Sequence, residues 1–288
     1  MWRPTLGEGV VAGACAMGEE ATKLRELLNP DYWNRRFESE ETYEWLGSYE
    51  DVADLLRDRL QHSKVKPGSR VLVVGNGNSQ MAQSFAKDSD AGLVVITDVS
   101  PIAVHKASER WDREASTSQG RDGASGRGVG DVHVQWAVCD MLHLPFQDGA
   151  FDLILEKGAM DVFEVDKGPD PWNPNVATSD RLHAWLDEAY RITADGGLLV
   201  SLSFAQPHFR MPYYEAGFNT TCHSYSSGAF VDYFMYCATK EHGGGSRRGP
   251  HRPGPPLHRR PHDAAPPIDT THGHMDDEDF LLKMECHD

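Results

Sequence analysis

Two glycines stand between an apolar run and the polar residues that follow it, in the sequence VLVVGNGNSQ. Gly75 and Gly77 lack a Cβ atom, so a ligand can approach the backbone closely at this point. Such a loop is typical of nucleotide-binding α/β proteins, and it also occurs as a tight turn without a ligand. The third glycine of G-x-G-x-x-G is missing, which disfavours a site for a dinucleotide pyrophosphate.

Acidic residues end the next two apolar runs. Asp98 follows LVVIT, where a carboxylate can accept hydrogen bonds from both ribose hydroxyls of a nucleoside. Asp140 follows VHVQWAVC and precedes Met141, so its carboxylate could bind an adenine amino group beneath apolar neighbours. Each acid could instead cap the next helix. Three such features at the ends of successive strands favour a ligand site, because ligands of open α/β sheets bind at the carboxyl ends of strands.

Charged residues also end the fourth run, FDLILEKGAMD. A buried strand has little reason to end in Glu156 and Lys157 unless a site needs charge, although a solvated loop would also accept them. Asp161 follows four residues after Lys157. We expect these three residues at the same rim as the preceding acids.

The apolar runs predict the elements that position these residues. Helices are expected at 19–29, where Asn29-Pro30 ends the helix, and at 48–62, 79–88, 101–114 and 179–193. Strands are expected up to Val74, Asp98, Asp140 and Gly158, and at 198–204 after the turn TADGG. The alternation predicts an α/β fold with a parallel sheet, and FNTTCHSYS and FVDYFMYCATK predict a closing antiparallel hairpin.

Composition divides the chain into one globular part and several appendages. We expect a flexible N-terminus at 1–18 and one domain at 19–240, with a Gly/Ser/Arg-rich flexible insertion at 115–130. Residues 241–267 are rich in Gly, Pro and Arg, and because that composition cannot bury a core, we expect a linker there. For residues 268–288 we expect an acidic-apolar tail.

Charge and cysteine content limit the partners. The net charge of -16, from 28 basic and 44 acidic residues, argues against a nucleic-acid partner and favours a cationic one. The apolar stretch at 10–18 is too short to span a membrane. The scattered cysteines predict neither a disulfide framework nor a metal site, and they favour a reducing, cytoplasmic setting: Cys15, Cys139, Cys222, Cys237 and Cys286.

Several segments together resemble a known family. DYWNRRF, YEWLGSYED, RVLVVGNGNS, DVSPIAV, FQDGAFDLILEKGAMD, TADGGLLVSLSFAQPHFR and the closing hairpin look like class I methyltransferases that use S-adenosyl-L-methionine (SAM) to methylate lysines of translation elongation factor 1A. The resemblance covers about residues 31–240. It implies a seven-stranded, mostly parallel Rossmann-like sheet, SAM as the cofactor, and elongation factor 1A as a protein substrate.

The resemblance also implies individual roles. SAM contacts are implied for Trp33, Phe37, Trp45, Gly75, Asp98, Val99, Asp140, Met141 and Lys157, and the glycine loop adds Gly77. Four positions depart from the family: Asn76 replaces Cys, Phe37 replaces Tyr, Val99 replaces an aromatic residue, and Met160 replaces Leu. Aromatic residues at 33–45 could cover a sulfonium through cation–π attraction, or could simply pack a helix against the core.

The stretch from Glu156 to Asp161 matches the element that the family needs for transfer. An acceptor lysine must lose its proton before it can accept a methyl group, because the protonated amine has no lone pair. Glu156 and Asp161 are therefore candidate catalytic residues, and Tyr213 could assist them. A small-molecule methyltransferase, an NAD(P)-dependent oxidoreductase and a non-catalytic binding module are the alternatives.

Overall fold

The computed structural model describes residues 23–118, 132–168, 170, 173–215, 217–228 and 232–241. The predicted flexible N-terminus, the C-terminal tail, nearly all of the linker and most of the insertion lie outside the described residues. Residues 115–118 of the expected insertion continue a helix instead.

Seven strands form one sheet in the order β3-β2-β1-β4-β5-β7-β6. Strands β1 to β5 run parallel, while β7 pairs antiparallel with both β5 and β6. This arrangement confirms the predicted mostly parallel sheet with an antiparallel hairpin at its end. The strands are β1 (Arg70–Val74), β2 (Leu93–Asp98), β3 (His133–Val138), β4 (Phe151–Lys157), β5 (Thr193–Ser203), β6 (Asn219–Ser226) and β7 (Asp232–Thr239).

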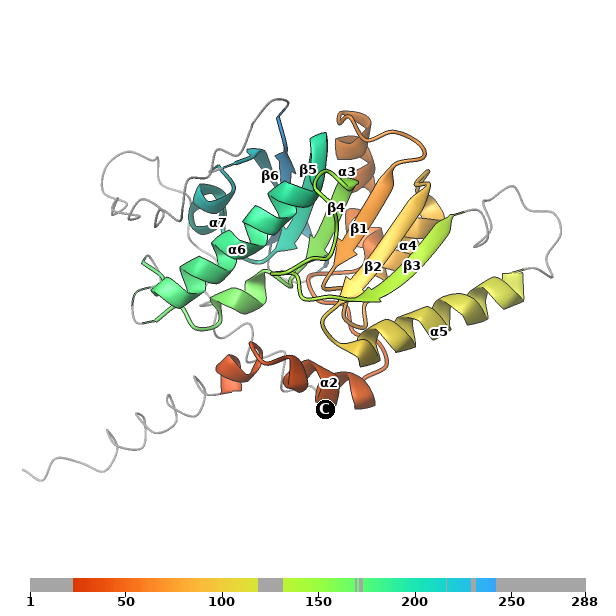
Figure 1. Ribbon diagram of the computed structural model, residues 1–288, viewed down its shortest axis with the longest axis horizontal. Coiled ribbons are helices and arrows are strands. Elements are labelled where there is room, and N and C mark those ends of the chain that lie inside the picture. Colours follow the sequence, from red (N-terminus) through yellow and green to blue (C-terminus); the bar gives the residue numbers. More distant parts are fainter. Residues whose placement is uncertain are drawn as a thin grey trace, which may run out of the picture.

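Helices cover both faces of the sheet (Figure 1). They are α2 (Pro30–Ser39), α3 (Tyr49–Gln61), α4 (Met81–Asp88), α5 (Pro101–Ser118), α6 (Val176–Ile192), α7 (Pro207–Tyr214) and the 3-10 helix η1 (Asp161–Glu164). Figure 1 shows α6 and α7 in front of the sheet, α3 and α4 behind it, and α2 below the ends of the parallel strands.

The core consists of two layers because strand side chains alternate between faces. Val71 and Val73 of β1 pack in the cluster that contains residues of α3, α4 and α5. Leu72 and Val74 pack in the cluster that contains residues of α6 and α7. Strands β1 and β4 are therefore buried on both faces, as their continuous apolar sequences predicted.

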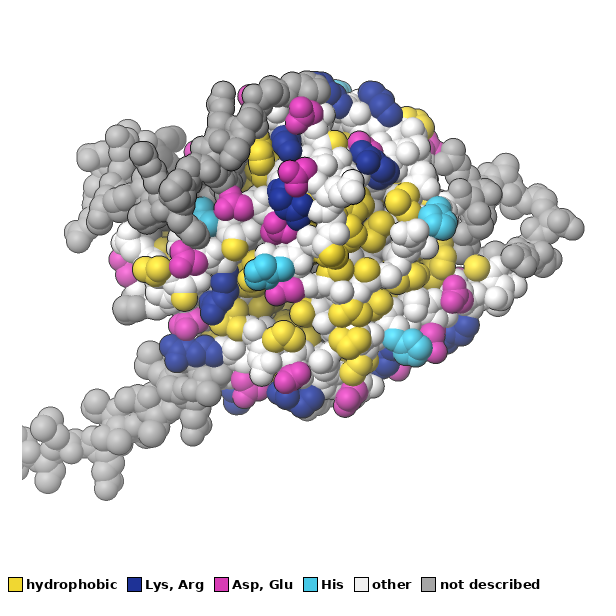
Figure 2. Space-filling model, in the orientation of Figure 1, with side chains coloured by type: hydrophobic (Ala, Val, Ile, Leu, Met, Phe, Trp, Pro, Cys, Tyr) yellow, Lys and Arg dark blue, Asp and Glu magenta, His cyan; other side chains and the backbone are white. Residues whose placement is uncertain are grey.

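The connection between β3 and β4 contains no helix, since residues 139–150 form a loop. Strand β3 is also the edge of the sheet, and its side chains alternate between exposed and half-buried. In Figure 2, hydrophobic side chains form a band across this part of the molecule, over the region of β2 and β3. The front of the sheet is therefore covered less completely here than at β4 and β5.

The element boundaries differ from the expectation at three places. A helix at residues 23–26 ends before Asn29-Pro30 as expected, but Pro30 also begins α2, because a proline in the first turn needs no N–H donor and Asn29 caps the helix. Strand β3 ends two residues before Asp140. Strand β5 begins at Thr193, so the expected turn TADGG lies inside the strand, beside a register shift with β4.

Candidate active site

A pocket of about 230 Å³ lies where the parallel strands end beneath α2. It is lined by residues from α2 and from the segments that follow β1, β2, β3 and β4. Among the predicted site residues, the pocket lining includes Trp33, Phe37, Trp45, Gly75, Gly77, Asp98, Val99, Asp140, Met141, Lys157 and Asp161. Glu156, in contrast, does not line the pocket.

The glycine loop and Asp98 form one unit. Gly75 has a φ of 62°, and a Cβ atom there would lie 2.4 Å from the Cβ of Ala159 in the loop after β4. The Asp98 carboxylate accepts hydrogen bonds from the Gly77 amide at 2.7 Å and the Ser100 amide at 2.8 Å. Burial raises the pKa of Asp98, while these amides act in the opposite direction. The carboxylate at the end of β2 thus orders the loop after β1.

The loop after β3 supplies a second carboxylate and an apolar surface. Asp140 is exposed, and its carboxylate accepts a hydrogen bond from the Leu142 amide at 2.9 Å. Cys139, Met141 and Leu142 line the pocket beside it. Burial raises the pKa of the Cys139 thiol. A flat, apolar ring with a polar edge matches this combination of groups.

Aromatic rings form the wall contributed by α2 and the segment after it. The rings of Trp33 and Phe37 stack with centroids 5.6 Å apart, and the Trp33 and Trp45 rings meet edge to face at 6.2 Å. The Arg36 guanidinium lies 5.1 Å from the Trp45 ring and 5.7 Å from the Tyr43 ring. The wall therefore both packs the helix and presents electron-rich rings to the pocket, so the two interpretations from the sequence are compatible.

Lys157 is half-buried at the end of β4, and its nearly inaccessible side chain pairs with a residue far away in the sequence. Its ammonium donates hydrogen bonds to the Glu44 carboxylate at 2.5 Å and to the Gly47 carbonyl at 2.9 Å. Burial lowers the pKa of Lys157, and the adjacent Glu44 raises it.

Asp161, in the segment after β4, belongs to the pocket. Asp161 lines the pocket, and its carboxylate accepts hydrogen bonds from the Ser203 hydroxyl at 2.5 Å and from the Arg210 guanidinium. Arg210 also donates to Glu164 at 2.6 Å and is fully buried. Burial raises the pKa of Asp161 to about 6, while Arg210 lowers it.

Glu156 lies behind the pocket wall rather than at the rim. Its side chain is 1% exposed and accepts hydrogen bonds from the Met160 amide at 2.8 Å and from the Ser201 hydroxyl. Burial and the nearby Asp161 carboxylate raise the pKa of Glu156 to about 7. Glu156 therefore holds the backbone turn that leads to Asp161.

Comparison with known proteins indicates which reaction and which cofactor this pocket serves. Residues 72–201 match the protein family described as "Methyltransferase domain". The matched segment begins in β1 and ends in β5, and it includes the glycine loop and each strand end that forms the pocket. The chain contains a class I methyltransferase domain. Its cofactor is SAM, which confirms the expectation from the sequence.

Curated relatives include methyltransferases with named substrates. "EEF1A lysine methyltransferase 4" of Mus musculus is 27% identical over 210 residues, which cover 71% of this chain and 73% of the relative. The Bos taurus protein of the same name is 27% identical over 216 residues, covering 73% and 75%. "eEF1A lysine and N-terminal methyltransferase" of Xenopus laevis is 30% identical over 190 residues, which are 64% of this chain but only 23% of that protein.

The groups in the pocket fit SAM by their chemistry. The glycine loop lets a ligand approach the backbone, and Asp98 and Asp140 offer carboxylate acceptors at the ends of two strands. Met141 and Leu142 provide an apolar surface for a base, and the aromatic wall suits a positively charged sulfur. Within the described ranges, no group of three or more His, Cys, Asp or Glu side chains is placed to bind a metal ion.

Sequence reasoning missed two charged residues that hold the walls of the pocket in place. Glu44 and Arg210 fix pocket residues through contacts with chain segments 113 and 49 residues away. Glu44 carries a weak signal, since it is an acid between the aromatic residues Tyr43 and Trp45. Arg210 carries none, because its burial depends on the position of α7.

No helix among the described residues is both long and apolar enough to cross a membrane.

Proposed function

We propose that this chain is a protein-lysine N-methyltransferase and that its substrate is translation elongation factor 1A. The names of the mouse and bovine relatives support this activity, because the alignments cover nearly three quarters of each chain. The observation that carries the proposal is Asp161, a buried carboxylate that lines the cofactor pocket and is fixed by Arg210.

When bound, SAM supplies a methyl group attached to a positively charged sulfur. The work of the protein is to present a neutral amine in line with that group and to remove the proton of the acceptor lysine beforehand. The pKa of Asp161 is about 6, so the carboxylate is largely ionised at neutral pH. It can therefore attract the acceptor ammonium and take up its proton as the lysine enters the apolar pocket.

Neighbouring residues hold Asp161 in position for this step. Ser203 and Arg210 bind its oxygens, and Glu156 fixes the turn before it through the Met160 amide. Asp161 is the residue that we propose to contact the acceptor amine. Glu156 and Arg210 act through Asp161 as positioning residues.

Transfer of labelled methyl groups to purified elongation factor 1A tests the proposal. We expect Asp161→Asn to lower turnover about 100-fold or more, the usual scale for loss of a proton-accepting group, while SAM affinity changes little. Glu41→Gln is the matched control, since Glu41 is exposed, lies outside the pocket lining and pairs its carboxylate with Lys106. Label on a metabolite of a cell extract, with none on the elongation factor, would instead indicate a small-molecule methyltransferase.

The proposed substrate also suggests where the protein works. Translation elongation takes place in the cytoplasm, so we propose a cytoplasmic location. The strongly acidic composition supports a protein partner rather than a nucleic acid. Imaging of a fluorescently tagged chain tests the location, and exclusive accumulation in an organelle would contradict it.

A further inference from the structure

The segment between α2 and α3, residues 40–48, forms part of the cofactor pocket and is fastened to its other walls. We refer to it as the clasp segment. Trp45 and Leu46 of the clasp segment line the pocket. The remaining walls come mainly from α2 and from the loops at the strand ends, so the position of the clasp segment decides whether the pocket is closed on this side.

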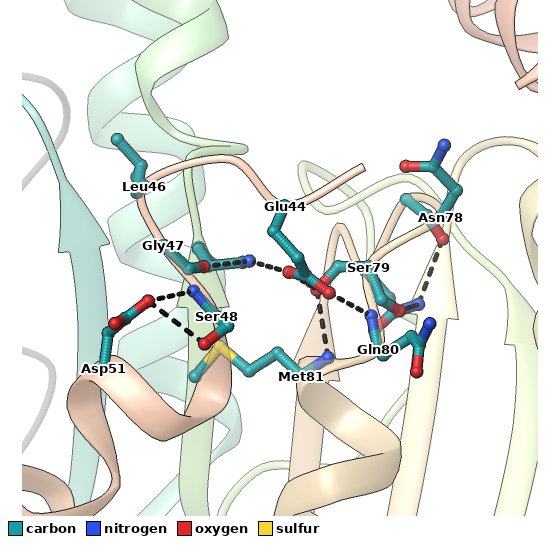
Figure 3. Close-up of polar contacts among 12 residues, drawn as sticks. Glu44, Leu46, Gly47, Ser48, Asp51, Asn78, Ser79, Gln80 and Met81 are labelled. Carbon is teal, nitrogen blue, oxygen red and sulfur yellow. Dashed lines mark hydrogen bonds and ion pairs between the residues drawn. The ribbon is translucent and has the colours of Figure 1, made fainter. Parts of the chain in front are cut away.

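Glu44 connects the clasp segment to two different walls (Figure 3). Its carboxylate accepts hydrogen bonds from the Ser79 hydroxyl and the Gln80 amide, both at 2.7 Å, where the glycine loop enters α4. The same carboxylate pairs with Lys157 at the end of β4. An acid at a helix N-terminus is favoured by the unpaired amides and by the helix dipole. Glu44 itself does not line the pocket.

The turn that follows Glu44 stores backbone strain. Leu46 has a φ of 59°, a left-handed conformation that residues other than glycine rarely adopt. Such a conformation persists only where the surroundings enforce it. Here the Tyr225 hydroxyl of β6 donates to the Leu46 carbonyl at 2.9 Å, and Lys157 donates to the Gly47 carbonyl. The strained turn is thus held by side chains from two strands, β4 and β6.

The charges explain why Glu44 is needed. The Lys157 side chain is only 8% exposed, and Glu44 is the carboxylate that pairs with it among the described residues. Without that carboxylate, the largely buried ammonium would keep the Gly47 carbonyl as a hydrogen-bond acceptor, and the Asp51 carboxylate would act on it only through space. Breaking such a pair is unfavourable because it leaves an uncompensated charge. The Lys157 contact with the Gly47 carbonyl, which holds the strained turn, would then be weakened.

We propose that Glu44 is a positioning residue that fastens the clasp segment over the pocket and thereby slows the release of SAM. The cofactor can leave when the contacts of Glu44 with Ser79, Gln80 and Lys157 break and the segment swings away. This inference concerns retention of the cofactor and does not depend on the identity of the methyl acceptor.

The test is the rate of SAM release, followed by the fluorescence change of the pocket tryptophans in a stopped-flow experiment. We expect release to be about tenfold faster in Glu44→Gln, which loses the charge pair, and faster still in Glu44→Ala. Ser79→Ala removes one contact of Glu44 and should have a smaller effect in the same direction. Glu41→Gln, in the same segment but with an exposed carboxylate that pairs with Lys106 and contacts neither Ser79, Gln80 nor Lys157, should release SAM at the wild-type rate.

Amide hydrogen exchange in the ligand-free protein provides a readout independent of catalysis. Faster exchange confined to residues 40–48 in Glu44→Gln is expected. Wild-type release in both Glu44→Gln and Ser79→Ala would overturn the proposal, and so would equal acceleration in Glu41→Gln. If Glu44→Ala does not fold, the other two variants still decide the question.

Discussion

At the scale of single residues, carboxylates of this protein serve the structure and the ligand at the same time. Asp98 shows this most clearly, because it binds two backbone amides while it lines the pocket. The sequence indicated its position at the end of a strand. It could not indicate the contacts with the glycine loop, since those depend on how β1 and β2 are paired.

Asp98 gives the first prediction. Asp98→Ala should weaken SAM binding by about 1.5–3 kcal/mol, the scale of hydrogen bonds to a charged group, and should also lower stability by about 1–3 kcal/mol because the buried amides lose their partner. Calorimetric titration and urea unfolding measure the two effects. Unchanged SAM affinity in a destabilised variant would limit Asp98 to its structural role.

Glu156 gives a prediction about pH. Its pKa in the folded protein is about 7, above the ordinary value of 4.5, so the folded state holds the proton more tightly than the unfolded state. This contribution is present below pH 4.5 and is lost as the pH rises toward 7. Wild type should therefore lose more stability than Glu156→Gln between pH 5 and 8. Urea midpoints at both pH values test this, and equal losses would contradict it.

At the scale of elements, the sequence predicted most accurately the strands that are buried on both faces. Strands β1, β2 and β4 are buried along nearly their whole length, so their apolar runs identified them. The start of α2 was missed, because Asn29-Pro30 was interpreted only as the end of the preceding helix, whereas the same pair also caps a new one. Residues that act across elements, such as Glu44 and Arg210, have at most a weak local sequence pattern.

The close approach of the loops after β1 and β4 gives a prediction with a matched control. Gly75→Ala combines an unfavourable positive φ with a contact of 2.4 Å to the Ala159 Cβ, whereas Gly68→Ala at a φ of 84° meets no atom within 4 Å. We expect Gly68→Ala to cost about 1 kcal/mol and Gly75→Ala about 1–3 kcal/mol more, with loss of SAM binding. Equal costs in urea unfolding would show that the loops can separate freely.

At the scale of the whole molecule, charge sets the conditions for meeting a substrate. The net charge of -16 should attract a cationic protein over long distances. Methylation of elongation factor 1A at low substrate concentration should therefore slow as salt is raised and the Debye length shrinks from about 30 to about 8 Å. A short peptide that contains the acceptor lysine and enough acidic residues to bring its net charge to zero is the control. Salt-independent rates for the full protein would exclude electrostatic steering.

Cys139 gives the pocket a chemical handle for selective inhibitors. The thiol belongs to the pocket lining beside Asp140 and Met141, and its raised pKa keeps it protonated at neutral pH. Free alkylating reagents should react slowly, since the thiolate is the nucleophile. An adenosine analogue carrying a weak electrophile would be held next to the sulfur and should label it faster. Such a compound would spare methyltransferases that lack a cysteine at this position.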